Sequence, residues 1–345
     1  MNNVQDSILV LCDSEEEYVL MMGEYLRKQK QLPWKVRTYT RVESLLAEEE
    51  QGQVTILVVS ESIYTGELER IRPKKTVILN ESGIVKEEKL CNINKYQPAE
   101  EVLKALLELY IETAKVPVTH LQEKSSCRFI GIYSPIRRCM QTRFALTMGQ
   151  LLSRKARVLY LNFEHYAGDT ELLEMDQARD LSDILYFMMA DKDKFALHMQ
   201  VVLKQKGEMD YIPPMKSGQN LLTISGEEWL NFMKKLDELG QYDYILMDLC
   251  DSMQGLFDIL RKCHRIYTIT QKDRIARSKV NQYEHLLQVY SYEDILEKTC
   301  KCNLPRIEYF PEYIEQYSTG ALADYVESLV ESMESDIGTA SGERR

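Results

Sequence analysis

The sequence has little that would place it across a membrane or outside a cell. No apolar run approaches the roughly 18 residues of a membrane-spanning helix, so no integral membrane segment is expected. Residues 1–7 carry no positive charge and no long apolar stretch, unlike a secretory signal. The eight cysteines form no CxxC pair, and no histidine stands close to Cys300 and Cys302. We therefore expect reduced thiols in a cytoplasmic protein, without a structural metal site.

The chain also lacks the basic surplus and the motifs of several functional classes. A formal net charge of −11 argues against general binding of nucleic acid or of anionic membranes, although a local basic patch remains compatible with it. The histidines form no HExxH motif, and neither Ser134 nor Ser225 has the GxSxG context of a hydrolase. The apolar content of 44% is that of a globular protein. A length of 345 residues favours two domains.

The first part of the chain alternates short apolar segments with amphipathic ones. This alternation predicts a parallel sheet with helices on both faces. The segments expected as strands are 7–12, 34–39, 54–59, 76–79 and 91–93, and those expected as helices are 15–29, 41–50 and 99–113.

A polar stretch then separates two α/β patterns. Residues 116–127 predict a linker between a domain at 1–115 and a second domain at 128–336, with a mobile tail at 337–345. The second domain has expected strands at 129–133, 157–162, 244–248 and 265–270, and expected helices at 141–154, 181–189, 193–203, 226–239, 278–288 and 320–333. The predicted fold class is therefore α/β, with two mainly parallel sheets flanked by helices.

The loop after the first strand of the second domain sits where a nucleotide-binding loop would lie. Such loops use glycines to bring backbone N–H groups close to phosphates, a lysine for the terminal phosphates and a Ser or Thr for magnesium. Residues 134–145 read S-P-I-R-R-C-M-Q-T-R-F-A and contain neither glycine nor lysine. Two acids follow later strands, Glu164 after 157–162 and Asp248 at the end of 244–248.

This order of elements resembles the ParA/MinD group of deviant Walker ATPases. The tract that carries the resemblance runs from Tyr133-Ser134-Pro135 through Thr142 to the strand at 158–162. Within that group, the two-domain layout is most similar to the TadZ/CpaE proteins of type IVb (Flp/Tad) pilus assembly. The resemblance implies a receiver-like, flavodoxin-like first domain and a P-loop NTPase-like second domain. It also implies a homodimer with pilus assembly and secretion proteins as partners. Those partners would recruit a cytoplasmic protein to the inner face of the membrane or to the cell pole.

Alignment with the family loop, Lys-Gly-Gly-x-Gly-Lys-Ser/Thr, implies that most nucleotide contacts have been replaced. Ile136 stands at the signature lysine, and Gln141 replaces the lysine that binds the terminal phosphates. Arg137, Arg138 and Met140 replace the three glycines, where left-handed backbone costs about 1 kcal/mol or more for each non-glycine residue.

The resemblance also implies which contacts remain. Thr142 keeps the magnesium hydroxyl, Asp248 matches the Walker B acid, and Glu164 falls near the acid that assists magnesium or water. Three arginines, Arg137, Arg138 and Arg143, restore positive charge to the loop. They serve either as an anion site or as solvated charges and partner contacts. The expectation is a poor or inactive ATPase, with ATP and magnesium as cofactors only if the altered loop still binds them.

The first domain resembles a receiver that has lost its phosphate acceptor. Ser60 stands at the acceptor aspartate, Lys95 matches the receiver family's lysine, and Asp13 supplies an acid after the first strand. A serine hydroxyl without a base is a weak nucleophile. Asp13 and Lys95 either form a leftover ion pair or are surface charges that never meet. We expect a constitutive docking or dimerisation module.

Three functions remain open from the sequence. The leading one is a non-catalytic, TadZ/CpaE-like protein that localises or assembles a Tad/Flp pilus system through protein contacts. The rival is a ParA/MinD-like ATPase with an altered loop and an ATP-dependent dimer switch, in which Asp248, Glu164 and Thr142 act. The third is a signalling adaptor whose receiver-like half binds a regulator.

Overall fold

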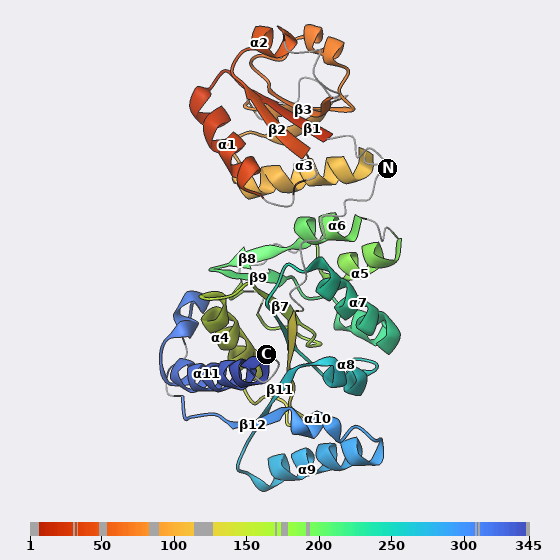
Figure 1. Cartoon of the computed structure of the whole chain (residues 1–345), viewed down its shortest axis with the longest axis vertical. Coiled ribbons are helices and arrows are strands. Elements are labelled where there is room, and N and C mark those ends of the chain that lie inside the picture. Colours follow the sequence, from red (N-terminus) through yellow and green to blue (C-terminus); the bar gives the residue numbers. More distant parts are fainter. Residues whose placement is uncertain are drawn as a thin grey trace. The chain divides into compact units, whose positions relative to one another are not determined.

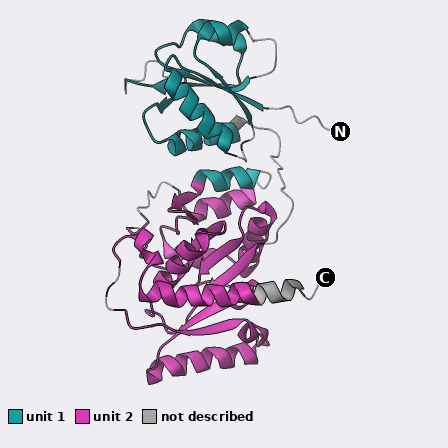
Figure 2. Cartoon of the chain, turned by 60° about the vertical axis from the view of Figure 1, so that its left-hand side comes forward, with its two compact units in different colours: residues 1–120, 191–201 teal, residues 121–190, 202–345 magenta. Residues whose placement is uncertain are grey.

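The chain forms two compact units. The computed structural model describes residues 7–29, 32, 34–47, 54–82, 90–113, 127–169, 171–173, 179–190, 194–307, 309 and 311–342. One unit contains residues 1–120 and 191–201, and the other contains residues 121–190 and 202–345 (Figure 2). Residues 191–201 thus group with the first unit although they lie far along the sequence. The predicted linker, apart from Cys127, lies outside the described residues.

The first unit contains a five-stranded parallel sheet in the order β2-β1-β3-β4-β5. This is the strand order of flavodoxin-like folds. All five strands expected from the sequence are present, and 34–39 lies at the edge. The strands are β1 (Ser7–Cys12), β2 (Trp34–Tyr39), β3 (Val54–Ser60), β4 (Lys75–Asn80) and β5 (Cys91–Asn94).

Alternating residues of the central strands build two separate cores, one on each face of this sheet. Leu9 and Leu11 of β1 pack on the face covered by α1 (Glu16–Lys28) and α3 (Ala99–Thr113), where Leu197 and Val201 of α6 (Phe195–Val202) join them. Residues of opposite parity, such as Val10, pack on the face covered by α2 (Val42–Ala47) and the 3-10 helix η2 (Gly66–Ile71). A sheet buried on both faces explains the continuous apolar runs of β1 and β3.

The second unit is built on a seven-stranded sheet in the order β12-β11-β6-β10-β7-β9-β8. Strands β7, β8, β9, β11 and β12 of this sheet are labelled in Figure 1. Every pair of neighbouring strands is parallel except β8 and β9. The strands are β6 (Arg128–Ile132), β7 (Val158–Asn162), β8 (Lys204–Lys206), β9 (Met209–Ile212), β10 (Tyr244–Asp248), β11 (Arg265–Thr270) and β12 (Thr299–Asn303).

Helices cover both faces of the second sheet. On one face, α4 (Gln141–Ser153) and α11 (Ala321–Gly342) share a core with β6, β10 and β11. On the other face, α8 (Leu256–Lys262) packs so closely on β6 that a Cβ at Gly131 would lie 3.0 Å from the sulfur of Cys263. The neighbouring α7 (Gly226–Leu239) begins with a capping box between Ser225 and Glu228. The remaining helices are α5 (Leu181–Ala190), η4 (Gly218–Thr223), α9 (Arg274–Val289), α10 (Asp294–Glu297) and η5 (Ile314–Ser318).

The structure adds elements that the sequence patterns did not predict. These are β8, β12, α8 and α10, all of which are short. The helix expected at 278–288 begins earlier, at Arg274, because Asp273 caps it by accepting hydrogen bonds from the N–H groups of Ile275 and Ala276. The helix α11 continues to Gly342, into the segment expected as a tail. None of the described helices is both long and apolar enough to cross a bilayer. All eight cysteines are free thiols.

Candidate functional sites

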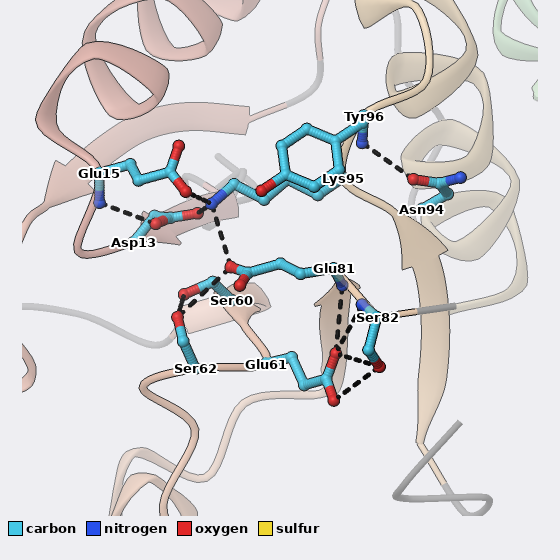
Figure 3. Close-up of polar contacts among 10 residues, drawn as sticks. All are labelled: Asp13, Glu15, Ser60, Glu61, Ser62, Glu81, Ser82, Asn94, Lys95 and Tyr96. Atoms are coloured by element: carbon cyan, nitrogen blue, oxygen red, sulfur yellow. Dashed lines mark hydrogen bonds and ion pairs between the residues drawn. The ribbon is translucent and has the colours of Figure 1, made fainter. Parts of the chain in front are cut away.

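The first unit gathers charged side chains at the carboxyl edge of its sheet. Asp13 and Glu15 follow β1, Glu81 follows β4, and Lys95 follows β5. The carboxyl ends of parallel strands all lie at the same edge of a sheet, so residues that are far apart in sequence meet there. Figure 3 shows the ammonium group of Lys95 at the centre of this group, with carboxylates directed toward it from the loops after β1 and β4.

The ammonium group of Lys95 is bound by three carboxylates at once. Its Nζ lies 2.9 Å from Asp13 Oδ2, 2.9 Å from Glu15 Oε1 and 3.0 Å from Glu81 Oε1. The side chains of Lys95 and Asp13 are completely buried, whereas that of Glu15 is half exposed. Burial alone would lower the pKa of Lys95, but its hydrogen bonds to the three carboxylates outweigh this and raise the pKa. The lysine is therefore a permanent internal cation.

The serine at the expected acceptor position belongs to a hydrogen-bonded chain that leads to the same lysine. The hydroxyls of Ser60 and Ser62 lie 3.0 Å apart, and Ser62 donates to Glu81 Oε1 at 3.3 Å (Figure 3). The neighbouring Glu61 accepts hydrogen bonds from the backbone N–H groups of Glu81 and Ser82. Each side chain at this edge is thus held by another one from the same chain.

Of the residues expected in this site, the structure brings together Asp13 and Lys95 as an ion pair. Ser60 contacts them only through Ser62 and Glu81. The roles of Glu15 and Glu81 were not anticipated, although both stand within three residues of the end of a predicted strand. Their position at the carboxyl edge of a parallel sheet was the signal available in the sequence.

The loop after β6 in the second unit has an unusual backbone. Arg137, Arg138 and Met140 have φ values of 60°, 47° and 66°, in the left-handed region. These are the three positions that the resemblance aligned with glycines. Left-handed residues other than glycine carry a steric penalty, so surrounding contacts must hold the loop in this shape.

The amide of Gln141 is one of those contacts. Gln141 is the first residue of α4, and its Nε2 donates to Asp248 Oδ1 at 2.7 Å and to the carbonyl of Leu249 at 2.8 Å. The next residue, Thr142, also hydrogen-bonds to Asp248. The loop and the end of β10 are therefore joined by hydrogen bonds within the chain.

A buried acidic pair lies behind this contact. Asp248 is fully buried, and burial raises its pKa to about 7 although the bonds from Gln141 and Thr142 oppose the shift. The hydroxyl of Tyr160 lies 3.3 Å from Asp248 Oδ2 and 3.3 Å from Asp169 Oδ2. A phenol has one proton and can donate to only one of these carboxyls at a time. Burial also raises the pKa of Asp169, so that both acids next to this phenol are more readily protonated than an exposed carboxyl.

At the outer side of the loop, charged side chains form contacts that are more exposed than the buried ones of Gln141 and Asp248. Arg137 forms an ion pair with Asp251, which follows β10. Lys279 of α9 donates to the carbonyl of Ile136 at 3.3 Å. Burial raises the pKa of Glu164, whose carboxylate is partly stabilised by Arg137. Arg138 is exposed and Arg143 is half-buried on α4. Neither Asp251 nor Lys279 was predicted from the sequence, because both depend on tertiary contacts with the loop.

Comparisons with known proteins find similarity in solved structures only. No protein-family model matches the chain, and no curated protein sequence does. A ParA family ATPase from Chlorobium tepidum is 15% identical over 58% of this chain and 96% of its own, with a TM-score of 0.45. The MinC:MinD cell division complex from Aquifex aeolicus is 14% identical over 59% of this chain and 96% of that chain, with a TM-score of 0.45. A plasmid partition protein from Borrelia burgdorferi is 14% identical over 60% of this chain and 100% of its own, with a TM-score of 0.44. The structural neighbours therefore include ParA/MinD-family P-loop ATPases. The likeness concerns the fold, and the ligands of those proteins are not assigned to this chain by it.

Proposed function

We propose that the protein is a non-catalytic, TadZ/CpaE-like interaction protein. In this proposal it helps to localise or assemble a Tad/Flp pilus system, as a cytoplasmic homodimer that its partners recruit to the membrane or the cell pole. The sequence resemblance supplies the pilus role. The side-chain contacts of the loop after β6 supply the argument that nucleotide chemistry has been lost.

The single observation that carries the loss of chemistry is the contact between Gln141 and Asp248. A neutral amide, at the position aligned with the phosphate-binding lysine, donates to the acid aligned with Walker B at 2.7 Å. Catalysis of phosphoryl transfer relies on positive charge at the γ-phosphate, and a glutamine amide does not supply it. The residues present therefore do not fit a magnesium nucleotide, and we derive no step through one.

The left-handed residues of the loop support the same proposal. A phosphate loop works because glycine exposes backbone N–H groups without a side chain. Here Arg137, Arg138 and Met140 carry full side chains at left-handed φ. The guanidinium group of Arg137 also forms an ion pair with Asp251. The rival, an ATPase with an altered loop, keeps Thr142 and Asp248 in contact, but the side chain that donates to Asp248 at the position of the lysine is a neutral amide.

The first test asks whether the protein binds and hydrolyses ATP. A ligand that binds only the native state raises the melting temperature. Because the proposal is that the loop does not bind ATP, we expect no shift in melting temperature with ATP and magnesium. A variant with Arg137→Gly, Arg138→Gly, Met140→Gly and Gln141→Lys provides the positive control, because it restores the three glycines and the lysine that binds the terminal phosphates. ATP turnover by the natural protein that disappears in Asp248→Ala would establish the rival function instead.

The second test addresses the pilus role. The tagged protein is co-expressed with the secretion ATPase of a Tad/Flp system and purified. We expect co-purification of the natural protein and of Asp248→Asn alike, because the contact does not depend on nucleotide. A protein that neither co-purifies with this ATPase nor changes its position in cells that lack it would have a different role.

A further inference from the structure

An aromatic cavity lies beside the loop, and two of the residues that line it, Asp251 and Lys279, also contact the loop. Its volume is about 590 Å³, and it opens between the loop after β6, the start of α8 and one side of α9. Ligand-binding pockets commonly have volumes of 300–1,000 Å³ and are lined by apolar and aromatic side chains with a few polar groups. The apolar lining here comes from Tyr133, Leu256, Phe257, Tyr283, Leu286 and Tyr292.

The rings of this cavity support one another. The centroids of Tyr133 and Tyr283 are 5.3 Å apart, those of Phe257 and Tyr283 are 6.1 Å apart, and those of Phe257 and Tyr292 are 5.4 Å apart. Tyr133 and Tyr283 are almost completely buried. Packed rings change rotamer at a cost, so the cavity is preformed and loses little entropy when a side chain enters it.

The apolar surface continues beyond the cavity along α9. Ile275, Lys279, Gln282 and Leu286 are spaced at i, i+4, i+7 and i+11, which places them on one face of the helix. Ile275 at one end of this face is 73% exposed, and Tyr290 just after the helix is 60% exposed. The cavity and the face of α9 between these two exposed apolar residues are together called the groove below.

Two acids, Asp251 and Asp258, and one cation, Lys279, line the cavity, and the exposed cations Arg138, Lys272 and Arg274 stand in the segments beside it, where Asp273 caps α9. The two acids that line it are already bonded, since Asp251 pairs with Arg137 and Asp258 accepts a hydrogen bond of 2.6 Å from the hydroxyl of Tyr292. Among the residues that the structure describes, no carboxylate pairs with the four exposed cations of this region, which are Arg138, Lys272, Arg274 and Lys279. The loops that carry Arg138 and Lys272 follow the neighbouring strands β6 and β11.

We propose that this groove is a docking site for an acidic segment of a partner protein. One aromatic or leucine side chain of the segment fills the cavity, and acidic residues beside it face Arg138, Lys272, Arg274 and Lys279. Protein interfaces have this form, with an apolar anchor in a pocket and a polar rim. The net charge of −11 disfavours binding of long polyanions such as nucleic acid, because their charges are repelled by those of the whole protein. It permits binding of a short acidic segment, which interacts mainly with the nearby cations of the rim.

The inference rests on the proposed role as an interaction protein, and it adds the chemistry of the partner. The probe is a fluorescent synthetic peptide of glutamate and aspartate with one central phenylalanine. A second peptide has alanine in place of that phenylalanine, and a third has lysine in place of every acid. Binding is measured by fluorescence anisotropy against the full chain at low salt, up to millimolar protein.

The acidic phenylalanine peptide should bind, and removal of its phenylalanine should weaken binding about tenfold or more. Lys279→Glu should weaken binding several-fold, with a loss that shrinks as salt is raised. The matched control is Lys234→Glu on α7, whose exposed side chain is far in sequence from the groove and leaves binding unchanged. Tyr290→Ala tests the exposed end of the groove without touching the buried rings.

Three results would overturn the proposal. These are no binding of the acidic phenylalanine peptide, equal binding of the alanine or lysine peptide, and equal effects of Lys279→Glu and Lys234→Glu. Tighter binding of anionic vesicles or duplex DNA than of the acidic phenylalanine peptide would assign the rim to a different partner and also overturn it. ATP turnover would contradict the proposed function alone, because the peptide assay contains no nucleotide.

Discussion

The two units place a different kind of side chain at corresponding positions in their folds. At the carboxyl edge of the first sheet, a buried lysine is surrounded by three carboxylates. At the carboxyl edge of the second sheet, a neutral glutamine amide contacts a buried aspartate that already shares a tyrosine with a second acid. The first arrangement has a full opposite charge at its centre, and the second has none.

This difference sets which groups are charged. Hydrogen bonds to the carboxylates raise the pKa of Lys95 despite its burial, so that the charge at the centre of the first site persists at neutral pH. In the second site the hydrogen bonds from Gln141 and Thr142 do not offset burial, and the pKa of Asp248 rises to about 7. Loss of charge is therefore most damaging in the first unit, and change of pH is most informative in the second.

The largest effect is expected from Lys95→Met, which removes the central cation. Breaking a buried ion pair from one side leaves an uncompensated charge and costs about 3–5 kcal/mol. Urea unfolding followed by a fluorescent label on the first unit measures this loss. Lys28→Met is the control, because its pair with Glu24 is exposed and is worth less than about 1 kcal/mol. Equal losses in the two variants would show that the three carboxylates do not depend on Lys95.

A pH profile separates the second site from the first. Because the pKa of Asp248 is raised in the folded state, the unfolded chain releases its proton first, and stability falls as pH rises from about 4 to about 7. The shift from 3.8 to about 7 corresponds to at most about 4 kcal/mol. Asp248→Asn should flatten this part of the profile.

The measurement is the free energy of unfolding from urea curves at several pH values. Asp243→Asn serves as the control, since its carboxylate binds Arg157 and has a lowered pKa, which gives stability that is lost as pH falls below 4. A profile of Asp248→Asn that keeps the same slope between pH 4 and 7 would mean that this acid is not the group that titrates.

A smaller effect is expected from Gln141→Ala. This change leaves a buried carboxyl without its amide donor and costs about 1–3 kcal/mol above pH 7, with a further rise in the pKa of Asp248. Gln150→Ala on the same helix is the matched control, because its amide donates to a neutral carbonyl, that of Lys206, at 3.2 Å. Thermal unfolding at pH 8 compares the two. A loss no larger than that of the control would contradict the assigned role of Gln141.

The smallest effect, and a stabilising one, is expected from Arg138→Gly. The φ of 47° costs a side-chain-bearing residue more than it costs glycine, so the variant should gain about 1 kcal/mol over Arg138→Ala. Arg154→Gly is the control, because the φ of −62° there has no left-handed strain and glycine is destabilising. Melting temperatures resolve the two signs. If glycine destabilises both positions, the loop is not strained at Arg138.

The sequence predicted the sheets well because their strands are buried on both faces and read as continuous apolar runs. It also singled out Asp13, Lys95, Gln141 and Asp248, each of which follows a strand or begins a helix. It did not predict Glu81, Asp169 or Asp251 as partners, because those pairings depend on strand order rather than on local pattern. The short strand β12 was missed because Cys300-Lys301-Cys302 has no apolar run.

The left-handed backbone of the loop after β6 also bears on how readily the loop could be redesigned. Arg137, Arg138 and Met140 already have the φ values that glycine tolerates best. Replacing them with glycine requires the removal of side chains and no change in the path of the chain. Here the path is supplied, and redesign is reduced to a choice of side chains.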